Sequence, residues 1–103
     1  MRQAFCVIGF PGAGKTTVAR FLVEVLRVEP YHLPTVIRPT VSRKFLESFY
    51  RCGRILPLRF DHLFLQHVAR KGKDPLVFDN YPSHEPSLRI LMRFAVRYDW
   101  RVH

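Results

Sequence analysis

The sequence has little cysteine and no long hydrophobic run. Two cysteines in 103 residues are too few for a disulfide framework and lack metal-ligand spacing, so we interpret Cys6 and Cys52 as reduced thiols. The longest apolar stretch, residues 4–10, is far shorter than the roughly 18 residues that span a bilayer. It also leads into glycines without the small-residue cleavage site of a signal peptide. We therefore expect an intracellular, cytoplasmic protein with no membrane partner.

Acidic residues are scarce relative to basic ones. The 8 Asp and Glu oppose 17 Lys and Arg, which gives a formal net charge of +9 and a pI near 10.4. This excess favours partners that carry phosphate without saying which. Hydrophobic residues make up 48% of the chain, enough to bury a core, so we do not expect disorder. The length predicts one domain, residues 1–103, and excludes a two-domain enzyme.

Short apolar runs alternate with helical patterns along the chain. Residues 3–8 and 76–79 are typical of buried strands, and residues 100–103 resemble the start of another. Between prolines, residues 35–38 are a weaker strand candidate. Strands that alternate with helices indicate an α/β fold in three layers, with a small parallel sheet flanked by helices.

Four segments have the apolar spacing of three and four that is typical of helices. They begin near residues 14, 45, 61 and 83; the third ends at Gly72, and Ser83 is the expected cap of the fourth. In the first, third and fourth segments, the residues expected to face the core are Val18, Phe21, Leu22, Val25, Leu26, Leu63, Phe64, His67, Val68, Leu88, Ile90, Leu91, Phe94, Ala95 and Tyr98.

Residues 9–16, GFPGAGKT, have the pattern of a phosphate-binding loop (P-loop, or Walker A motif) between a predicted strand and a predicted helix. Glycines let backbone N–H groups turn inward around a phosphate, which also faces the N-terminus of the helix. Lys15 is placed to reach the β- and γ-phosphates, and the Thr16 hydroxyl to bind Mg²⁺. The alternative is a glycine-rich turn with a solvated lysine. The residues expected to bind ATP are Gly9, Pro11, Gly12, Ala13, Gly14, Lys15, Thr16 and Thr17.

Asp79 ends the second apolar strand, where parallel sheets place their ligand-binding groups. A carboxylate at this position can hold Mg²⁺ directly or through water and so offset the charge of a transferring phosphoryl group. The alternative is that Asp79 only starts a turn into Asn80 and Pro82. We favour the magnesium role, with Thr16 and Asp79 as the metal-binding residues.

The two motifs together resemble the adenylate kinase group of nucleoside monophosphate kinases. Residues 9–17 (GFPGAGKTT) are similar to that family's phosphate loop, residues 76–82 (LVFDNYP) to its strand ending in Asp-Gly-Phe-Pro-Arg, and residues 53–57 (GRILP) to its Gly-Lys-Leu-Val-Pro stretch. The resemblance covers nearly the whole chain, as the N-terminal half of such a kinase. It implies a truncated P-loop NTPase-like fold that transfers the γ-phosphate of ATP to a nucleotide or similar small acceptor, with Lys15 and Asp79 as catalytic residues.

The sequence departs from this family where the acceptor would bind. Ser83 replaces an arginine, Ser87 replaces a glutamine that reads adenine, and residues 39–42 replace a Ser-Thr-Gly-Asp turn, which leaves Thr40 and Arg43 as acceptor-site candidates. The arginine-bearing lid of the family has no counterpart in residues 1–103. Two hypotheses therefore remain open: an active phosphotransferase, and a catalytically weak or inactive nucleotide-binding remnant with a regulatory role.

A third hypothesis, which we favour less, is a basic nucleic-acid-binding module. Four arginines repeat at every fourth position, and the first three share one face of the last predicted helix: Arg89, Arg93, Arg97 and Arg101. Such a ridge could follow a phosphate backbone, whereas a solvated helix face is the simpler interpretation.

Overall fold

A computed structural model describes residues 1–8, 15–52 and 57–103. Its sheet has three parallel strands in the order β2–β1–β3: β1 (Arg2–Val7), β2 (Leu76–Asp79) and β3 (Trp100–Val102). Ala4 pairs with Leu76 and Val7 with Asp79 along one side of β1, while Ala4 pairs with Val102 on the other side. The three better-supported strand predictions are therefore confirmed.

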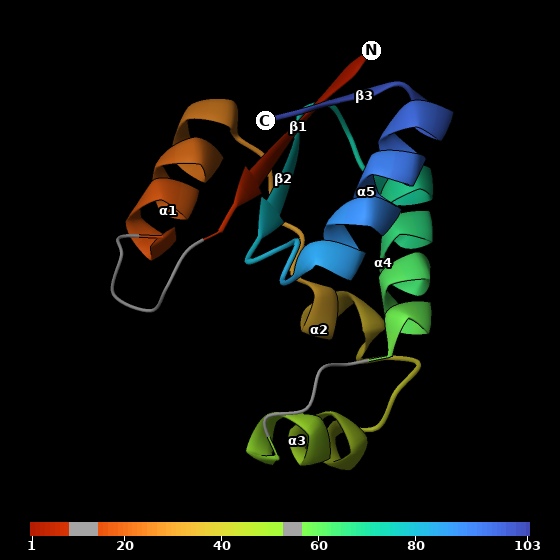
Figure 1. Cartoon of the computed structure of the whole chain (residues 1–103). Helices are drawn as coiled ribbons and strands as arrows, with labels where there is room; N and C mark the ends of the chain where they lie inside the picture. The colour runs from red at the N-terminus through yellow and green to blue at the C-terminus, as the bar shows by residue number, and fades with distance from the viewer. Residues whose placement is uncertain (9–14, 53–56) are drawn as a thin grey trace.

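Helices cover both faces of this sheet. The described residues form α1 (Lys15–Leu26), α2 (Leu33–Ile37), α3 (Arg43–Arg51), α4 (Leu58–Lys71) and α5 (Glu85–Tyr98). Figure 1 shows α1 on one side of the strands and α4 with α5 on the other, with α2 and α3 beyond the carboxyl end of β2. The predicted α/β fold, with a small parallel sheet flanked by helices, is confirmed. No helix in the described ranges is long and apolar enough to cross a membrane.

The main core lies between the sheet and the pair α4 and α5. Phe64 of α4, Phe78 of β2 and Tyr81 are almost fully buried, and their ring centroids lie 5.0 to 5.8 Å apart. The Tyr81 hydroxyl donates a 2.9 Å hydrogen bond to Oδ2 of Asp61, a carboxylate that is only 2% exposed. Burial and the Asp61 charge raise the pKa of Tyr81 well above its usual range, so this hydroxyl stays a donor. The bond ties the chain after β2 to α4.

The predicted strand at residues 35–38 is wrong, because Leu33–Ile37 forms α2. Pro34 lies in the first turn of this helix, where its fixed φ and missing N–H favour a helix start. The extended segment lies earlier. Tyr31 forms a parallel bridge with Phe78, donating its N–H to the Val77 carbonyl and accepting the N–H of Asp79.

The helix predicted near residue 14 is confirmed as α1, but much of its apolar stripe is not buried. Leu22 and Leu26 are half-buried and pack with Val28 against Val7 and Val77. The exposed fractions of the others are 50% for Val18, 63% for Phe21 and 59% for Val25. The prediction that these three face the core is wrong, because only one edge of α1 meets the sheet.

The other predicted helices form, with three corrections. Gly72 caps α4 as expected, and a Cβ there would lie 2.5 Å from the Val68 carbonyl oxygen. Leu63 and Leu88 are more than 40% exposed, because α4 and α5 pack through Phe64, Leu65, Leu91 and their neighbours instead. Tyr98 is 36% exposed. Ser83 does not cap α5: the capping position belongs to His84, whose side chain makes no capping hydrogen bond.

Replacing Tyr81 by Phe should destabilise the fold by about 1–3 kcal/mol, because the buried Asp61 carboxylate loses its hydrogen-bond donor. In a domain of this size, that is a fall of about 5–20 °C in melting temperature, measured by circular dichroism. Tyr98→Phe is the matched control, since the Tyr98 hydroxyl makes no hydrogen bond with another described residue. Equal shifts for the two variants would contradict the role given to the Tyr81–Asp61 bond.

Phe21 and Phe64 should respond differently to substitution. Phe21→Lys is expected to change the free energy of unfolding by less than about 0.5 kcal/mol, because the Phe21 ring is mostly in solvent. Phe64→Ala should cost about 3–5 kcal/mol, because that ring is fully buried. Urea denaturation of the two variants measures both values. A large loss for Phe21→Lys in the isolated chain would show that α1 packs more extensively than described.

Candidate functional site

Asp79 lies where the first and second strands end together. It pairs in register with Val7, the last residue of β1, and its N–H donates a 2.9 Å hydrogen bond to the Tyr31 carbonyl. The next residue, Asn80, has a φ of 55° and donates its N–H to the Val7 carbonyl at 2.8 Å. These backbone bonds fix the half-buried Asp79 beside the point at which the chain leaves β1.

Residues 9–14 of the predicted phosphate loop lie outside the described residues. They include five of the predicted ATP-binding residues: Gly9, Pro11, Gly12, Ala13 and Gly14. Lys15 and Thr16 are the first two residues of α1, with side chains that are likewise not described. Thr17 follows them in the first turn and is exposed. The described residues therefore place a strand, β1, before residues 9–14 and a helix, α1, after them. The phosphate contacts of the loop stay a prediction.

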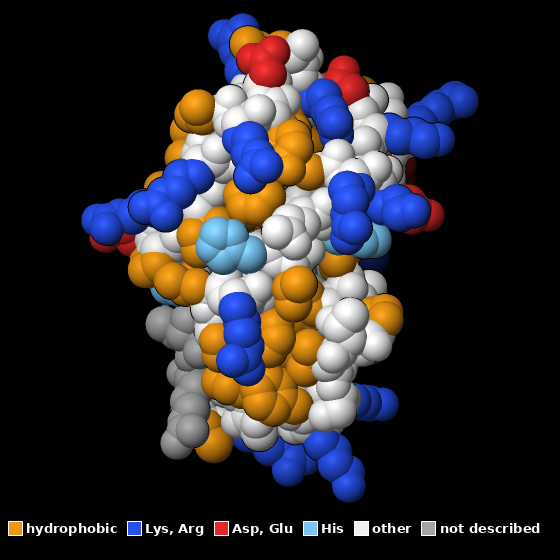
Figure 2. All heavy atoms as spheres, turned by 90° about the vertical axis from the view of Figure 1, so that its right-hand side faces the viewer, with side chains coloured by type: hydrophobic (Ala, Val, Ile, Leu, Met, Phe, Trp, Pro, Cys, Tyr) orange, Lys and Arg blue, Asp and Glu red, His pale blue; other side chains and the backbone are white. Residues whose placement is uncertain are grey.

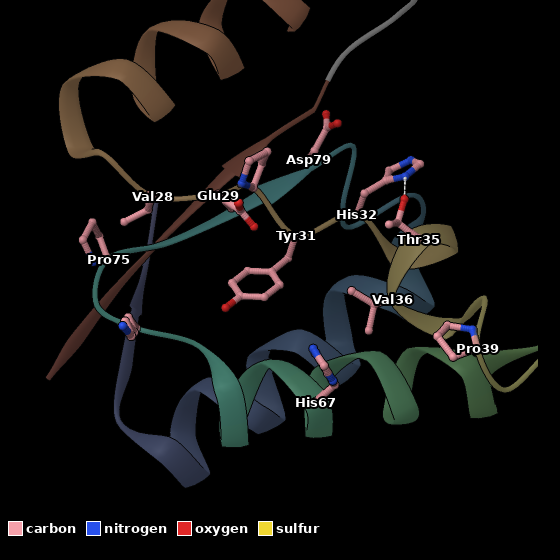
Figure 3. Close-up of a pocket in the computed structure, with 12 residues that line it drawn as sticks. Val28, Glu29, Tyr31, His32, Thr35, Val36, Pro39, His67, Pro75 and Asp79 are labelled. Carbon is pink, nitrogen blue, oxygen red and sulfur yellow. Dashed lines mark hydrogen bonds between the residues drawn. The ribbon is translucent and has the colours of Figure 1, made fainter.

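The Asp79 carboxylate suits the magnesium role predicted for it. It makes no hydrogen bond or ion pair with another described residue, and Figure 3 shows it pointing away from Tyr31 at the end of the strand. The described residues contain no group of three His, Cys, Asp or Glu that could hold a metal ion. Mg²⁺ commonly takes one or two protein ligands beside phosphate oxygens and water, so a single carboxylate is sufficient.

A pocket of about 630 Å³ opens beside β2 and reaches Asp79 (Figure 3). It is lined by the segment before α2, by α2 itself, by one residue of α4 and by the residues around β2. Its polar lining residues are Glu29, Tyr31, His32, Thr35, His67, Lys73 and Asp79. Of these, sequence reasoning found only Asp79. The others come from three separate parts of the chain, and no local motif groups them.

Tyr31 projects into this pocket from the segment that bridges to β2. Its ring meets His67 of α4 edge to face, with centroids 6.4 Å apart (Figure 3). Burial, and after it the negative charge of Glu29, raise the pKa of Tyr31, so its hydroxyl remains protonated at neutral pH. At the Asp79 end, Nδ1 of His32 lies 3.1 Å from the Thr35 hydroxyl. The pocket thus combines ring surfaces with hydrogen-bonding groups.

Ser83 and Ser87, which were predicted to replace acceptor-binding residues, both contact His84. Oγ of Ser83 and Oγ of Ser87 each lie 2.9 Å from Nδ1 of His84. Ser87 is 1% exposed, and its carbonyl also accepts a 3.4 Å bond from Tyr81. These serines therefore form a local cluster at the start of α5, and neither lines the pocket. Thr40 and Arg43, the other acceptor candidates, do not line it either.

The arginine ridge is shorter than its sequence spacing suggests. Arg89 forms an ion pair with Glu85, and the Arg97 guanidinium lies over the Tyr98 ring at 5.5 Å. Trp100 packs on Phe94 of α5, so Arg101, the next residue along β3, falls on the opposite face of the sheet. Figure 2 shows Lys and Arg side chains scattered among apolar ones on the α4–α5 side. This arrangement agrees better with a solvated face than with a polynucleotide track.

The cysteines give this site no chemistry. Cys6 and Cys52 are both free, as expected. Burial raises the pKa of the Cys6 thiol to about 11, which keeps it in the unreactive protonated form at neutral pH.

Comparison with known proteins supports the resemblance that the motifs suggested. No protein-family model matches the chain. The adenylate kinase of Campylobacter fetus subsp. fetus is 28% identical over 100 residues, which is 90% of this chain and 52% of that enzyme. The adenylate kinase of Helicobacter hepaticus is 30% identical over 90 residues, which is 80% of this chain and 47% of that enzyme. The chain spans about half the length of the curated relatives it matches. It is thus related to the adenylate kinases and resembles one half of such an enzyme.

Proposed function

We propose that the chain binds ATP·Mg²⁺ at the loop 9–17 and at Asp79. The observation that carries this proposal is the register of the sheet, which pairs Asp79 with Val7, two residues before the loop motif. The similarity to adenylate kinases supports a nucleoside monophosphate kinase-like function in general terms. The cytoplasmic location expected from the sequence agrees with a ligand found inside cells and stays a prediction.

The proposed chemistry is transfer of the ATP γ-phosphate to a small acceptor. Bound Mg²⁺ supplies positive charge against the phosphate oxygens, and Thr16 and Asp79 are the residues that would hold it. Lys15 adds a second positive charge at the β- and γ-phosphates, while the loop backbone orients them. In such reactions the protein mainly positions and neutralises its substrates, which these residues suit.

The alternative of a weakly active or inactive binding module is favoured by one specific observation. Ser83 and Ser87, which replace an arginine and a glutamine of the family, are engaged with His84 and do not line the pocket. The described residues therefore offer no arginine at these positions to hold an acceptor monophosphate. We infer that ATP binding is retained while transfer to a nucleoside monophosphate is impaired. The nucleic-acid-binding alternative has no comparable support.

Binding of ATP·Mg²⁺ should stabilise the isolated chain. At 100 times the dissociation constant, one bound ligand adds about 2.7 kcal/mol, a melting shift of roughly 10–20 °C in a domain this small. Lys15→Ala should remove most of this shift, whereas Lys71→Ala, at the exposed end of α4, should keep it. Differential scanning fluorimetry with purine and pyrimidine triphosphates makes the comparison. A folded chain that shifts with none of them would refute the proposed function.

Phosphoryl transfer to AMP is expected to be well below the rate of about 1–100 per second that is typical of kinases. Loss of one cation that stabilises the transition state can by itself cost a factor of about 10³. Coupled assays of ADP formation and of phosphorylated product, across the common nucleoside monophosphates, measure this. Asp79→Asn should lower whatever ATP turnover is present. A rate within the kinase range would show that the serine substitutions do not impair the acceptor site.

A further inference from the structure

The pocket beside β2 gathers negative charge in a strongly basic protein. All 8 acidic residues lie within the described ranges. Five of them form a side-chain hydrogen bond or ion pair with another described residue. The three without one are Glu24, Glu29 and Asp79, and the last two line the pocket. Carboxylates that are not engaged by the protein are available to accept hydrogen bonds from a ligand.

The described residues that line the pocket carry little positive charge. Lys73 is the one Lys or Arg among its lining residues, and it precedes β2, whereas Asp79 ends that strand. The four residues of β2, the last of which is Asp79, span about 10 Å, so Lys73 lies at the opposite end of the strand from Asp79. Among the described lining residues, no lysine or arginine lies beside Asp79. The described lining therefore offers an acceptor's own phosphate group no positive charge near Asp79.

The interior of the pocket offers aromatic and apolar surface on which a ligand ring can pack. Tyr31 presents its ring from beside the sheet edge and His67 from α4, and the two rings meet edge to face with centroids 6.4 Å apart (Figure 3). Val36 and Pro39 add apolar surface from the α2 side. A volume of about 630 Å³ lies within the range of small-molecule sites. Glu29 is close enough for its charge to act on Tyr31, so a ring held there would have a carboxylate and a neutral hydroxyl nearby.

We propose that this pocket binds an uncharged, ring-bearing polyol of the nucleoside class, with its ring against Tyr31 and His67 and its hydroxyls donating to Glu29. The consequence of this binding for catalysis rests on the proposed function. With ATP at the loop, the acceptor is a hydroxyl: its oxygen bonds to the γ-phosphorus as the bond to the ADP oxygen breaks. ADP then leaves with the bonding electron pair, and the hydroxyl proton passes to water.

Isothermal titration of the 103-residue chain with adenosine, guanosine, cytidine and uridine, and with their monophosphates, tests the proposal. At least one nucleoside should bind more tightly than its own monophosphate, by about fivefold or more. Glu29→Gln should lower the affinity for that nucleoside about tenfold, the usual effect of losing a hydrogen bond to a charged group. Glu24→Gln is the matched control, because Glu24 is an exposed acid on α1 outside the pocket and should leave the affinity unchanged.

Tyr31→Ala should also lower the affinity for the nucleoside. A circular dichroism melt shows whether this variant is folded. Should it not fold, Glu29→Gln carries the test alone. A monophosphate that binds more tightly than every nucleoside, with an affinity lost in Lys73→Ala, would overturn the proposal. The proposal would also be overturned if the nucleoside affinity were unchanged in Glu29→Gln and ATP displaced the nucleoside, since the nucleoside would then occupy the ATP site.

The Lys15→Ala variant separates this inference from the proposed function. It should lose ATP binding and retain nucleoside binding. If the wild-type chain binds ATP but no nucleoside, the pocket inference is wrong and the proposed function stands. If it binds a nucleoside in a Glu29-dependent way but no triphosphate, the proposed function is wrong and the pocket assignment stands.

Discussion

The parallel register between the first two strands is the constraint on which the rest of this structure depends. Val7 opposite Asp79 aligns the carboxyl ends of β1 and β2, and the Asn80 N–H bonded to the Val7 carbonyl holds that alignment. A slip of one residue would turn every side chain of β2 to the other face of the sheet. Phe78 would then leave the main core, and Asp79 would move away from the start of the loop motif. Fold and candidate site therefore share one set of backbone bonds.

The buried Tyr81–Asp61 bond extends this constraint into the helical layer. It joins the segment after β2 to α4, and Tyr81 also reaches the Ser87 carbonyl at the start of α5. This segment is where the chain departs from the adenylate kinase pattern, with Ser83 and Ser87 turned toward His84. The serines thus belong to a well-connected part of the fold. These two serines differ from the adenylate kinase pattern, while the strand that ends in Asp79 agrees with it.

Features set by local sequence could be predicted, whereas features set by packing could not. The strands, the order strand–loop–helix and Asp79 at a strand end follow from short apolar runs and glycine spacing. Helix α2 was missed because Pro30, Pro34 and Pro39 suggested a broken segment, although Pro34 is compatible with the first turn of a helix. The exposure of Phe21 and Leu63 depends on which helix edge meets the sheet. The pocket was missed because Glu29, Tyr31 and His67 come together only through the Tyr31 bridge and the placement of α4.

The proposed ATP-binding site combines the aligned ends of β1 and β2 with the loop motif. Amide chemical-shift mapping of the ¹⁵N-labelled chain, titrated with ATP·Mg²⁺, tests it most directly. We predict that the amides of Ile8, Thr17 and Asp79 shift together along one saturating curve, because they surround the same ligand. Shifts confined to the arginines of α5, without saturation and lost on adding salt, would contradict the claim and indicate nonspecific attraction of a polyanion to a basic surface.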